Sequence, residues 1–153
     1  MITLWRISNH IDLAGLGGTK FSSRWSSRGN RIVFLAESPA GAILEVLVHL
    51  KDRSYPLPST YSLLEIEAPE THSVKELMPR ADAKWRSSPK LTQRIGDQWL
   101  SSMETPLGRV PSAIMPRTWN VLLNPRHRDA LEVRIISVIR EQFDNRLFRF
   151  GTR

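Results

Sequence analysis

The sequence predicts an α+β fold, in which short strands dominate and two or three helices interrupt them without regular alternation. Runs of β-branched, aromatic and aliphatic residues at 2–7, 31–36 and 60–68 have the composition and length of strands. A continuous apolar run at 40–50 and a periodic one at 90–102 have the length of helices. This pattern is not that of a doubly wound parallel sheet, in which strands and helices alternate strictly.

The first part of the chain combines two strands with a glycine-rich connection. After the strand at 2–7, glycines and serines at 13–31 predict a loop or weak hairpin. Ser38 and Pro39 then open a helix, because serine is a favoured N-cap and proline suits the first helical turn. Residues 40–50 are apolar almost all round, which indicates a buried helix.

The rest of the chain again alternates between strands and polar connections. Two prolines predict a loop at 51–59, and Pro69 ends the strand at 60–68. The polar stretch 70–90 predicts a surface excursion with one helical turn near Val74–Leu77. The segments expected after it are a helix at 90–102, strands at 109–115 and 117–123 separated by Pro116, a turn or short helix at 126–131, and a strand at 132–141.

Composition limits the classes of function. The 153 residues fit one domain, 1–153, and the lack of cysteine excludes disulfide scaffolds, cysteine zinc sites and thiol nucleophiles. A net charge of +7 favours an anionic partner, which can be a nucleic acid, a phosphate-bearing small molecule or an acidic protein. The N-terminus lacks a signal-peptide pattern, and no apolar run approaches the roughly 20 residues of a membrane span. We therefore expect a soluble, cytoplasmic protein with no membrane partner.

Glu45 is the most anomalous residue, since it lies inside the apolar run GAILEVLVHL. A carboxylate there costs several kcal/mol unless it is paired, hydrogen-bonded or neutralised. Helical spacing places Gly41, Glu45 and His49 on one stripe. The pattern leaves two interpretations equally open, a functional carboxylate or a Glu–His pair on the solvated edge of a buried helix.

Two arginines are further candidates for binding an anion. Arg6 interrupts the apolar strand LWRIS, and Arg24 stands beside Trp25 in a loop. Arginine binds phosphate and carboxylate groups through paired hydrogen bonds. On pattern alone the structural alternatives are favoured: an outward-pointing Arg6 in an alternating strand, and a solvated Arg24.

Other motifs carry weaker signals. The run Gly15-Leu16-Gly17-Gly18 matches no phosphate-binding loop and predicts a turn. Ser112 heads a predicted strand, but no G-x-S-x-G elbow surrounds it, so a neighbouring hydrogen bond is the simpler role. The scattered histidines have no metal-ligand spacing, and we expect no metal.

Six segments, taken in order, resemble the RES-domain family, the toxins of bacterial toxin–antitoxin modules that are named for an Arg, a Glu and a Ser. The resemblance extends over nearly the whole chain. The segments are LWRI at 4–7, SRW at 23–25, IVFLAESPAGAILEVLVHL at 32–50, VPSAIMP at 110–116, WNVLLNPRH at 119–127 and FDNRLF at 143–148.

This resemblance implies a compact fold similar to ADP-ribosyltransferases, with short, mostly antiparallel strands around an NAD cleft between sheets. It implies that NAD is the substrate and that its nicotinamide–ribose bond is cleaved by hydrolysis, phosphorolysis or ADP-ribosyl transfer, causing growth arrest. It also implies a cognate antitoxin with an Xre-type helix-turn-helix domain, which blocks the cleft.

The resemblance also implies roles for individual residues. Glu45 matches the family's glutamate, which would stabilise the cationic ribose. Arg6 would hold a phosphate or ribose of NAD, and Arg24 the diphosphate. Ser112 would hydrogen-bond the nicotinamide-side ribose or order Glu45. Phe34 stands where many members carry tyrosine, and it can stack on the nicotinamide ring but supplies no hydroxyl.

Two other functions remain as alternatives. The charge would suit a basic nucleic-acid-binding module or an RNase-type toxin, although no His, Lys or carboxylate constellation for RNA cleavage is legible and the dispersed arginines disfavour direct nucleic-acid binding. The other alternative is a binding-only relative, in which Phe34 in place of tyrosine has abolished catalysis and the chain serves mainly as a partner of its antitoxin.

Overall fold

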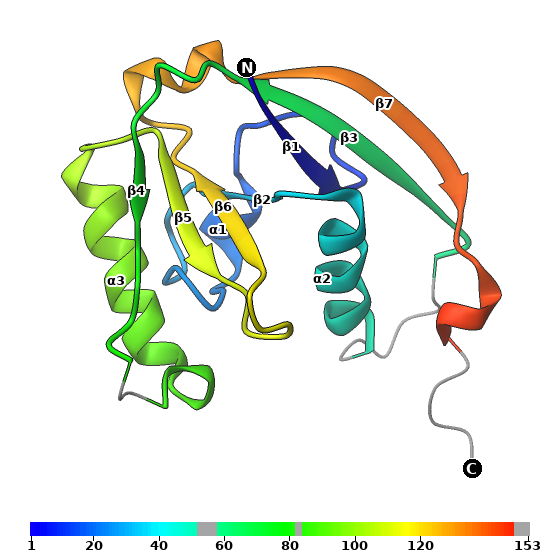
Figure 1. The fold of residues 1–153 in the computed structure, drawn as a ribbon, viewed down its shortest axis with the longest axis horizontal. Helices are drawn as coiled ribbons and strands as arrows, with labels where there is room; N and C mark the ends of the chain where they lie inside the picture. The colour runs from blue at the N-terminus through cyan, green and yellow to red at the C-terminus, as the bar shows by residue number, and fades with distance from the viewer. Residues whose placement is uncertain (52–57, 82–83, 149–153) are drawn as a thin grey trace.

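The computed structural model describes residues 1–51, 58–81 and 84–148, and its strands form a seven-stranded sheet (Figure 1). The strands are β1 (Ile2–Ile7), β2 (Val33–Ala36), β3 (Thr60–Ala68), β4 (Val74–Glu76), β5 (Leu107–Pro111), β6 (Trp119–Leu123) and β7 (Arg134–Gln142). The helices are α1 (Gly17–Lys20), α2 (Pro39–Lys51) and α3 (Pro89–Ser102), with 3-10 helices η1 (Trp85–Ser87), η2 (Arg128–Glu132) and η3 (Asn145–Phe148).

The strands follow the order β4-β5-β6-β2-β1-β3-β7. Every neighbouring pair is antiparallel except β4 and β5, which run parallel. The predicted α+β fold with mostly antiparallel strands is therefore confirmed.

The sheet consists of two halves that barely join. β1 pairs with β3 along its full length, whereas β1 and β2 share the single register pair Trp5–Ala36. The half formed by β1, β3 and β7 therefore diverges from the half formed by β2, β6, β5 and β4 (Figure 1). The resemblance placed the cleft between two sheets, and the structure corrects this, because the strands belong to one sheet with a seam at Trp5–Ala36.

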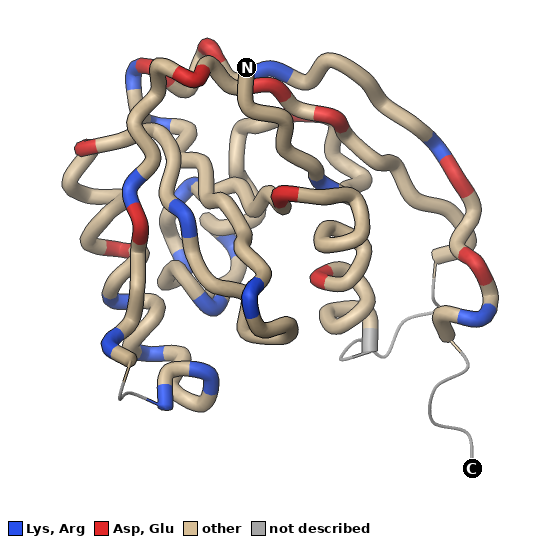
Figure 2. Tube along the Cα trace, viewed as in Figure 1, with Lys and Arg blue, Asp and Glu red and all other residues tan. Residues whose placement is uncertain are grey.

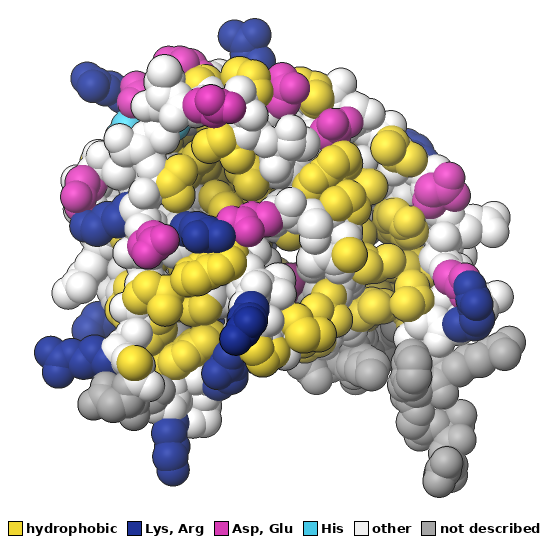
Figure 3. Space-filling view, in the orientation of Figure 1, with side chains coloured by type: hydrophobic (Ala, Val, Ile, Leu, Met, Phe, Trp, Pro, Cys, Tyr) yellow, Lys and Arg dark blue, Asp and Glu magenta, His cyan; other side chains and the backbone are white. Residues whose placement is uncertain are grey.

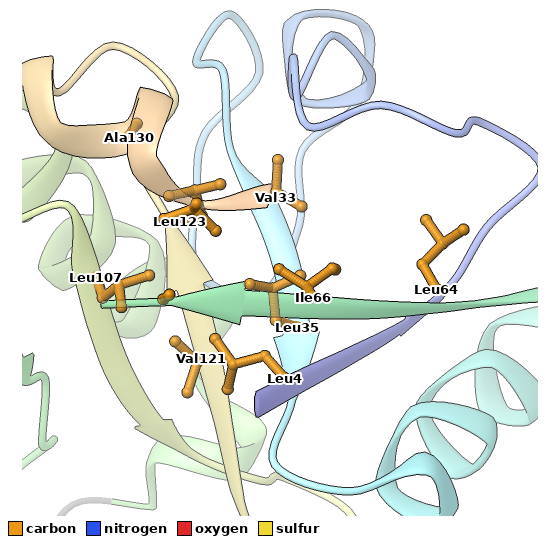
Figure 4. Close-up of a cluster of buried hydrophobic side chains, with 11 residues drawn as sticks. Leu4, Val33, Leu35, Leu64, Ile66, Leu107, Val121, Leu123 and Ala130 are labelled. Carbon is orange, nitrogen blue, oxygen red and sulfur yellow. The ribbon is translucent and has the colours of Figure 1, made fainter. Parts of the chain in front are cut away.

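Two hydrophobic clusters stabilise the sheet. The first, drawn in Figure 4, packs the sheet against Ala130 of η2 and the adjacent Val133. The second joins β5 and β6 to Trp99 and Leu100 of α3. Full burial of a leucine or isoleucine contributes about 1.5–3 kcal/mol relative to exposure. The first cluster also contains Leu4, Val33, Leu35, Leu64, Ile66, Ala68, Leu107, Val121 and Leu123.

Helices α2 and α3 cover the same face of the sheet and leave a gap between them. Helix α2 packs on β1 and β2 at the seam, and Trp99 of α3 lies against Gly108 of β5. Residue pairing puts Val110, Asn120, Ala36 and Trp5 on one face, because directly opposed strand residues point to the same side. In the space-filling view, apolar side chains extend from β7 across to α2 (Figure 3).

Several predicted elements agree closely with the structure. The strands at 2–7 and 60–68 have the predicted bounds, and the helix predicted at 40–50 is α2. Its N-cap is also as predicted, because the Gly41 N–H donates a 3.0 Å hydrogen bond to Ser38 Oγ. The turn or short helix predicted at 126–131 is η2, while the loop predicted at 51–59 lies mostly outside the described residues.

One prediction about local structure is wrong, and another is incomplete. Residues 74–76 form β4 rather than a helical turn, because β5 supplies backbone partners that an isolated turn lacks, including the Arg109 carbonyl that accepts from Leu77 N–H at 2.8 Å. The segment 13–31, predicted as a loop or weak hairpin, is mostly loop and also contains the one-turn helix α1. Gly15 precedes it with a φ of +68°, and an added Cβ would lie 2.7 Å from the Ile32 nitrogen.

Helix α3 anchors the loop between α1 and β2. Gln93 Nε2 donates to the Ser23 carbonyl at 2.8 Å, and the Asp97 carboxylate accepts from the Ser27 N–H at 2.8 Å and from Asn30 at 3.1 Å. Gly96 allows the backbones to meet, since an added Cβ would lie 1.6 Å from the Trp25 carbonyl oxygen. The loop is therefore held on α3 at Ser23, Ser27 and Asn30.

This close approach makes Gly96→Ala a sharp test of the α3 contact. We expect the variant to lose about 1–3 kcal/mol of unfolding free energy or more, because backbone rather than a flexible side chain must move. Gly17→Ala is the matched control, since an added Cβ there meets nothing within 4 Å and alanine favours a helix. Urea unfolding measures both variants, and equal midpoints for the two would contradict the packing described here.

Candidate active site

A cleft of about 340 Å³ opens at the seam between the two halves of the sheet. Trp5, Phe34 and Ala36 contribute its sheet side, and Glu45 and His49 contribute its α2 side. The loop anchored on α3 closes the opposite side with Ser23, Arg24 and Trp25. Segments distant in the sequence thus meet around one cavity, which is a common arrangement for ligand sites.

Glu45 faces this cleft from the middle of α2 and is half-buried. Its Oε1 accepts hydrogen bonds from Ser112 Oγ at 3.1 Å and from Asn120 Nδ2 at 2.8 Å. The two donors offset the cost of placing a carboxylate on an apolar helix. The Glu–His interpretation of the stripe is not observed among the described residues, because His49 is exposed and Glu45 bonds elsewhere.

Ser112 follows the end of β5 instead of heading a strand, which corrects the prediction for 109–115. Its Oγ accepts hydrogen bonds from the N–H groups of Ile114 and Met115, at 3.1 and 3.2 Å, so the side chain itself builds a turn and ends the strand. With those acceptor positions occupied, the hydroxyl proton is directed to Glu45. Ser112 is 2% exposed and reaches the cleft through Glu45 rather than lining it.

Asn120 is the site residue that the sequence reasoning missed. It lies in β6, opposite Ala36 of β2 and Val110 of β5, and it lines the cleft. The available signal was an amide inside the apolar strand WNVLL, which is the same kind of anomaly that marked Glu45. Its Oδ1 is buried and has no hydrogen-bond partner within the described part of the chain.

Arg6 borders the cleft at the end of β1. It is paired with Leu64 and shares the Leu4 side of the strand, opposite to Trp5, and its Nη1 donates to the Asp12 carbonyl at 2.8 Å. Burial lowers the pKa of Arg6 from its ordinary value, and the Asp12 carboxylate partly opposes this. A guanidinium nevertheless keeps its proton in proteins, so Arg6 brings a positive charge to the seam.

Arg24 is a half-buried side chain on the cleft wall rather than a free surface arginine. Its Nη1 donates to the Arg86 carbonyl at 3.0 Å, which leaves other N–H groups of the guanidinium for a ligand. The neighbouring Trp25 ring is buried and lies 6.1 Å from the Trp85 ring, so the loop is packed directly after Arg24.

Positive charge concentrates next to Arg24. Between residues 77 and 96 the chain carries basic residues at positions 80, 84, 86, 90 and 94 and a single acid at 82. Figure 2 shows this basic region around η1 and the start of α3, while Asp and Glu are more frequent along the upper rim. The cleft therefore has a carboxylate near the seam and Arg24 at the opposite wall, and the basic stretch lies outside the cleft lining.

The cleft thus brings together Arg6, Arg24, Phe34 and Glu45 as predicted neighbours, with Ser112 behind Glu45. Phe34 is 39% exposed, which leaves part of its ring open to a ligand. Within the described ranges, no group of three or more His, Asp or Glu side chains could hold a metal ion. Every described helix is too short or too polar to cross a bilayer.

Comparison with known proteins identifies the family. The model of the RES domain matches residues 3–145. "Toxin Res" of Pseudomonas putida is 46% identical over 132 residues, which cover 86% of this chain and 90% of the relative. "Prs ADP-ribosylating toxin" of a Sphingobium species is 34% identical over 163 residues, covering 96% and 97%.

A solved structure agrees in fold. The crystal structure of the M. tuberculosis MbcT–MbcA toxin–antitoxin complex contains a chain that matches with a TM-score of 0.71, covering 92% of this chain and 84% of that one. Sequence identity is 17%, so this match concerns the fold. The sequence matches confirm the predicted family. The chain belongs to the RES-domain family of toxins.

Proposed function

We propose that this toxin cleaves the nicotinamide–ribose bond of NAD. The observation that carries the proposal is a half-buried carboxylate, Glu45, held by Ser112 and Asn120 in a cleft that two arginines also border. One relative is named as an ADP-ribosylating toxin, and such an enzyme breaks this bond. The site needs no metal for this chemistry, because a carboxylate can stabilise the cation that forms.

In the proposed step, the bond between ribose C1′ and the nicotinamide ring nitrogen breaks, and its electron pair leaves with nicotinamide. The ribose passes through an oxocarbenium-like state, as in glycoside cleavage. Glu45 accepts hydrogen bonds from the ribose hydroxyls and stabilises the developing positive charge. Water, phosphate or a protein side chain then attacks C1′ and releases its proton.

Binding of the remaining dinucleotide is assigned to the other cleft walls. The cavity is at the small end of the roughly 300–1,000 Å³ range of ligand sites, so we expect it to enclose the nicotinamide riboside half. The exposed part of the Phe34 ring offers a stacking surface for nicotinamide. Arg24 and its basic surroundings would hold the diphosphate, with Arg6 at the seam holding a phosphate or a ribose.

Release of free nicotinamide tests this function. We expect the purified protein to release nicotinamide from NAD and Glu45→Gln to release it at least about 100-fold more slowly, because the neutral amide cannot stabilise the cation. Glu141→Gln, at an exposed position of β7, is the matched control and should behave as wild type. Wild-type protein that releases nothing, even with phosphate or bacterial lysate, would refute the enzymatic proposal. Equal rates for wild type and Glu45→Gln would refute the role of Glu45.

We propose further that the toxin acts in the cytoplasm, that loss of NAD arrests growth, and that a cognate Xre-type helix-turn-helix antitoxin blocks the cleft. The structural neighbour comes from a toxin–antitoxin complex, which supports a partner of this class. An acidic or carboxylate-ended segment of the antitoxin would match the positive charges of Arg6 and Arg24, as the NAD diphosphate does.

Charge neutralisation in the antitoxin tests this mode of inhibition. Replacing the antitoxin's acidic contact residues by their amides should weaken inhibition of nicotinamide release about tenfold or more, and Arg24→Ala in the toxin should reduce the effect of those replacements. Titration of antitoxin against toxin activity measures both. An antitoxin that inhibits fully after losing every acidic contact would contradict the charge-mimicry model.

A further inference from the structure

Both hydrogen bonds that Glu45 receives end on the same oxygen. Ser112 Oγ and Asn120 Nδ2 converge on Oε1 at 3.1 and 2.8 Å, and among the described residues Oε2 receives none. A carboxylate held at one oxygen by two donors has a fixed plane and presents its second oxygen in a defined direction. The site therefore has one anchored oxygen and one oxygen available to a ligand.

We propose that Asn120 is a positioning residue that sets the orientation of the Glu45 carboxylate for cleavage. This inference rests on the proposed function and adds a residue that the RES name, taken from Arg, Glu and Ser, does not include. Asn120 acts through Glu45, and its side chain supplies no group to the bond-breaking step itself.

The location of Asn120 suits this role. It lies on β6, the central strand of the β2–β6–β5 ladder, where Ala36 and Val110 are its direct neighbours on either side. Apolar neighbours strengthen a hydrogen bond between an amide and a carboxylate. Ser112 lies in the loop after β5, so Asn120 is the donor that the sheet itself holds in place.

The hydrogen bonding of the Asn120 amide indicates that this residue does more than stabilise the fold. Its Nδ2 is used on Glu45, while its Oδ1 is buried without a partner in the described structure. An unsatisfied buried acceptor is costly, and an apolar side chain in this strand would avoid the cost. Groups that break the packing rule in this way are concentrated at functional sites, where orientation matters more than stability.

Loss of this donor should affect the chemical step more than substrate binding. The residues proposed to bind the dinucleotide, Arg24 and Phe34, do not depend on the Asn120 amide. A mobile Glu45 would still admit NAD but would stabilise the developing cation less well. The signature is a lower kcat with little change in KM.

The experiment compares two isosteric variants with a control. Asn120→Leu removes the donor and keeps the branched shape and the number of side-chain heavy atoms, and Asn120→Asp replaces the donor with a second carboxylate beside Glu45. Asn145→Asp, an exposed amide-to-acid change in η3, is the matched control. Nicotinamide release from NAD is measured as a function of substrate and pH, thermal unfolding monitors folding, and growth arrest on expression is an independent readout.

We expect Asn120→Leu to lower kcat about 10–100-fold, with KM within about threefold of wild type. We expect Asn120→Asp to lower kcat further and to move the acid limb of the rate profile to higher pH, because adjacent carboxylates resist joint ionisation. Asn145→Asp should match wild type. Retained kcat in Asn120→Leu, or an unchanged acid limb in Asn120→Asp, would overturn the proposal. Loss of cooperative unfolding in both variants would assign Asn120 to folding and overturn it as well.

Failure of the proposed function has a different outcome. If wild type releases no nicotinamide, the NAD reaction is refuted, and growth arrest decides the inference. Loss of arrest in both Glu45→Gln and Asn120→Leu, with both variants folded, would support orientation of Glu45 by Asn120. Full arrest by Asn120→Leu would overturn it.

Discussion

The placement of one carboxylate on an apolar helix determines the arrangement of the whole site. Helix α2 packs against β1 and β2, and this packing places the half-buried Glu45 at the cleft. Its charge requires donors from the facing elements, and β6 and the loop after β5 provide them. The carboxylate therefore ties α2 to the other half of the sheet, and its stability and its chemistry depend on the same two hydrogen bonds.

The seam in the sheet explains why a cavity exists there. β1 and β2 meet at a single register pair, so the floor of the cleft is formed where the ladder opens. The other strand pairs are longer, and β3 and β7 extend the β1 half well beyond α2 (Figure 1). Helix α3 completes the enclosure at a distance, because it holds the loop that carries Arg24 and Trp25. Two helices on one face and a divergent pair of strands thus create a pocket in an otherwise closely packed domain.

Sequence patterns predicted the elements whose local signals agree with their tertiary environment. The strands at 2–7 and 60–68 and the capped helix α2 follow directly from apolar runs bounded by polar, serine or proline residues. β4 could not be found this way, because its three exposed residues become a strand only through pairing with β5. The strand predicted at 109–115 extends past the end of β5 at Pro111, because the hydrogen bonds that Ser112 Oγ accepts form a turn there. Asn120 was not predicted as a site residue, because its hydrogen-bond partner Glu45 lies 75 residues earlier in the chain.

The distribution of charge along the cleft determines which ligand it favours more directly than the net charge of +7 does. At the seam, a fixed carboxylate favours a centre that becomes cationic, and at the wall held by α3 the Arg24 guanidinium favours an anion. A dinucleotide such as NAD carries its diphosphate at one end of the ribose and forms a cation at C1′ when nicotinamide leaves. The separation of the two charges along one cavity is thus a selective feature that composition could not reveal.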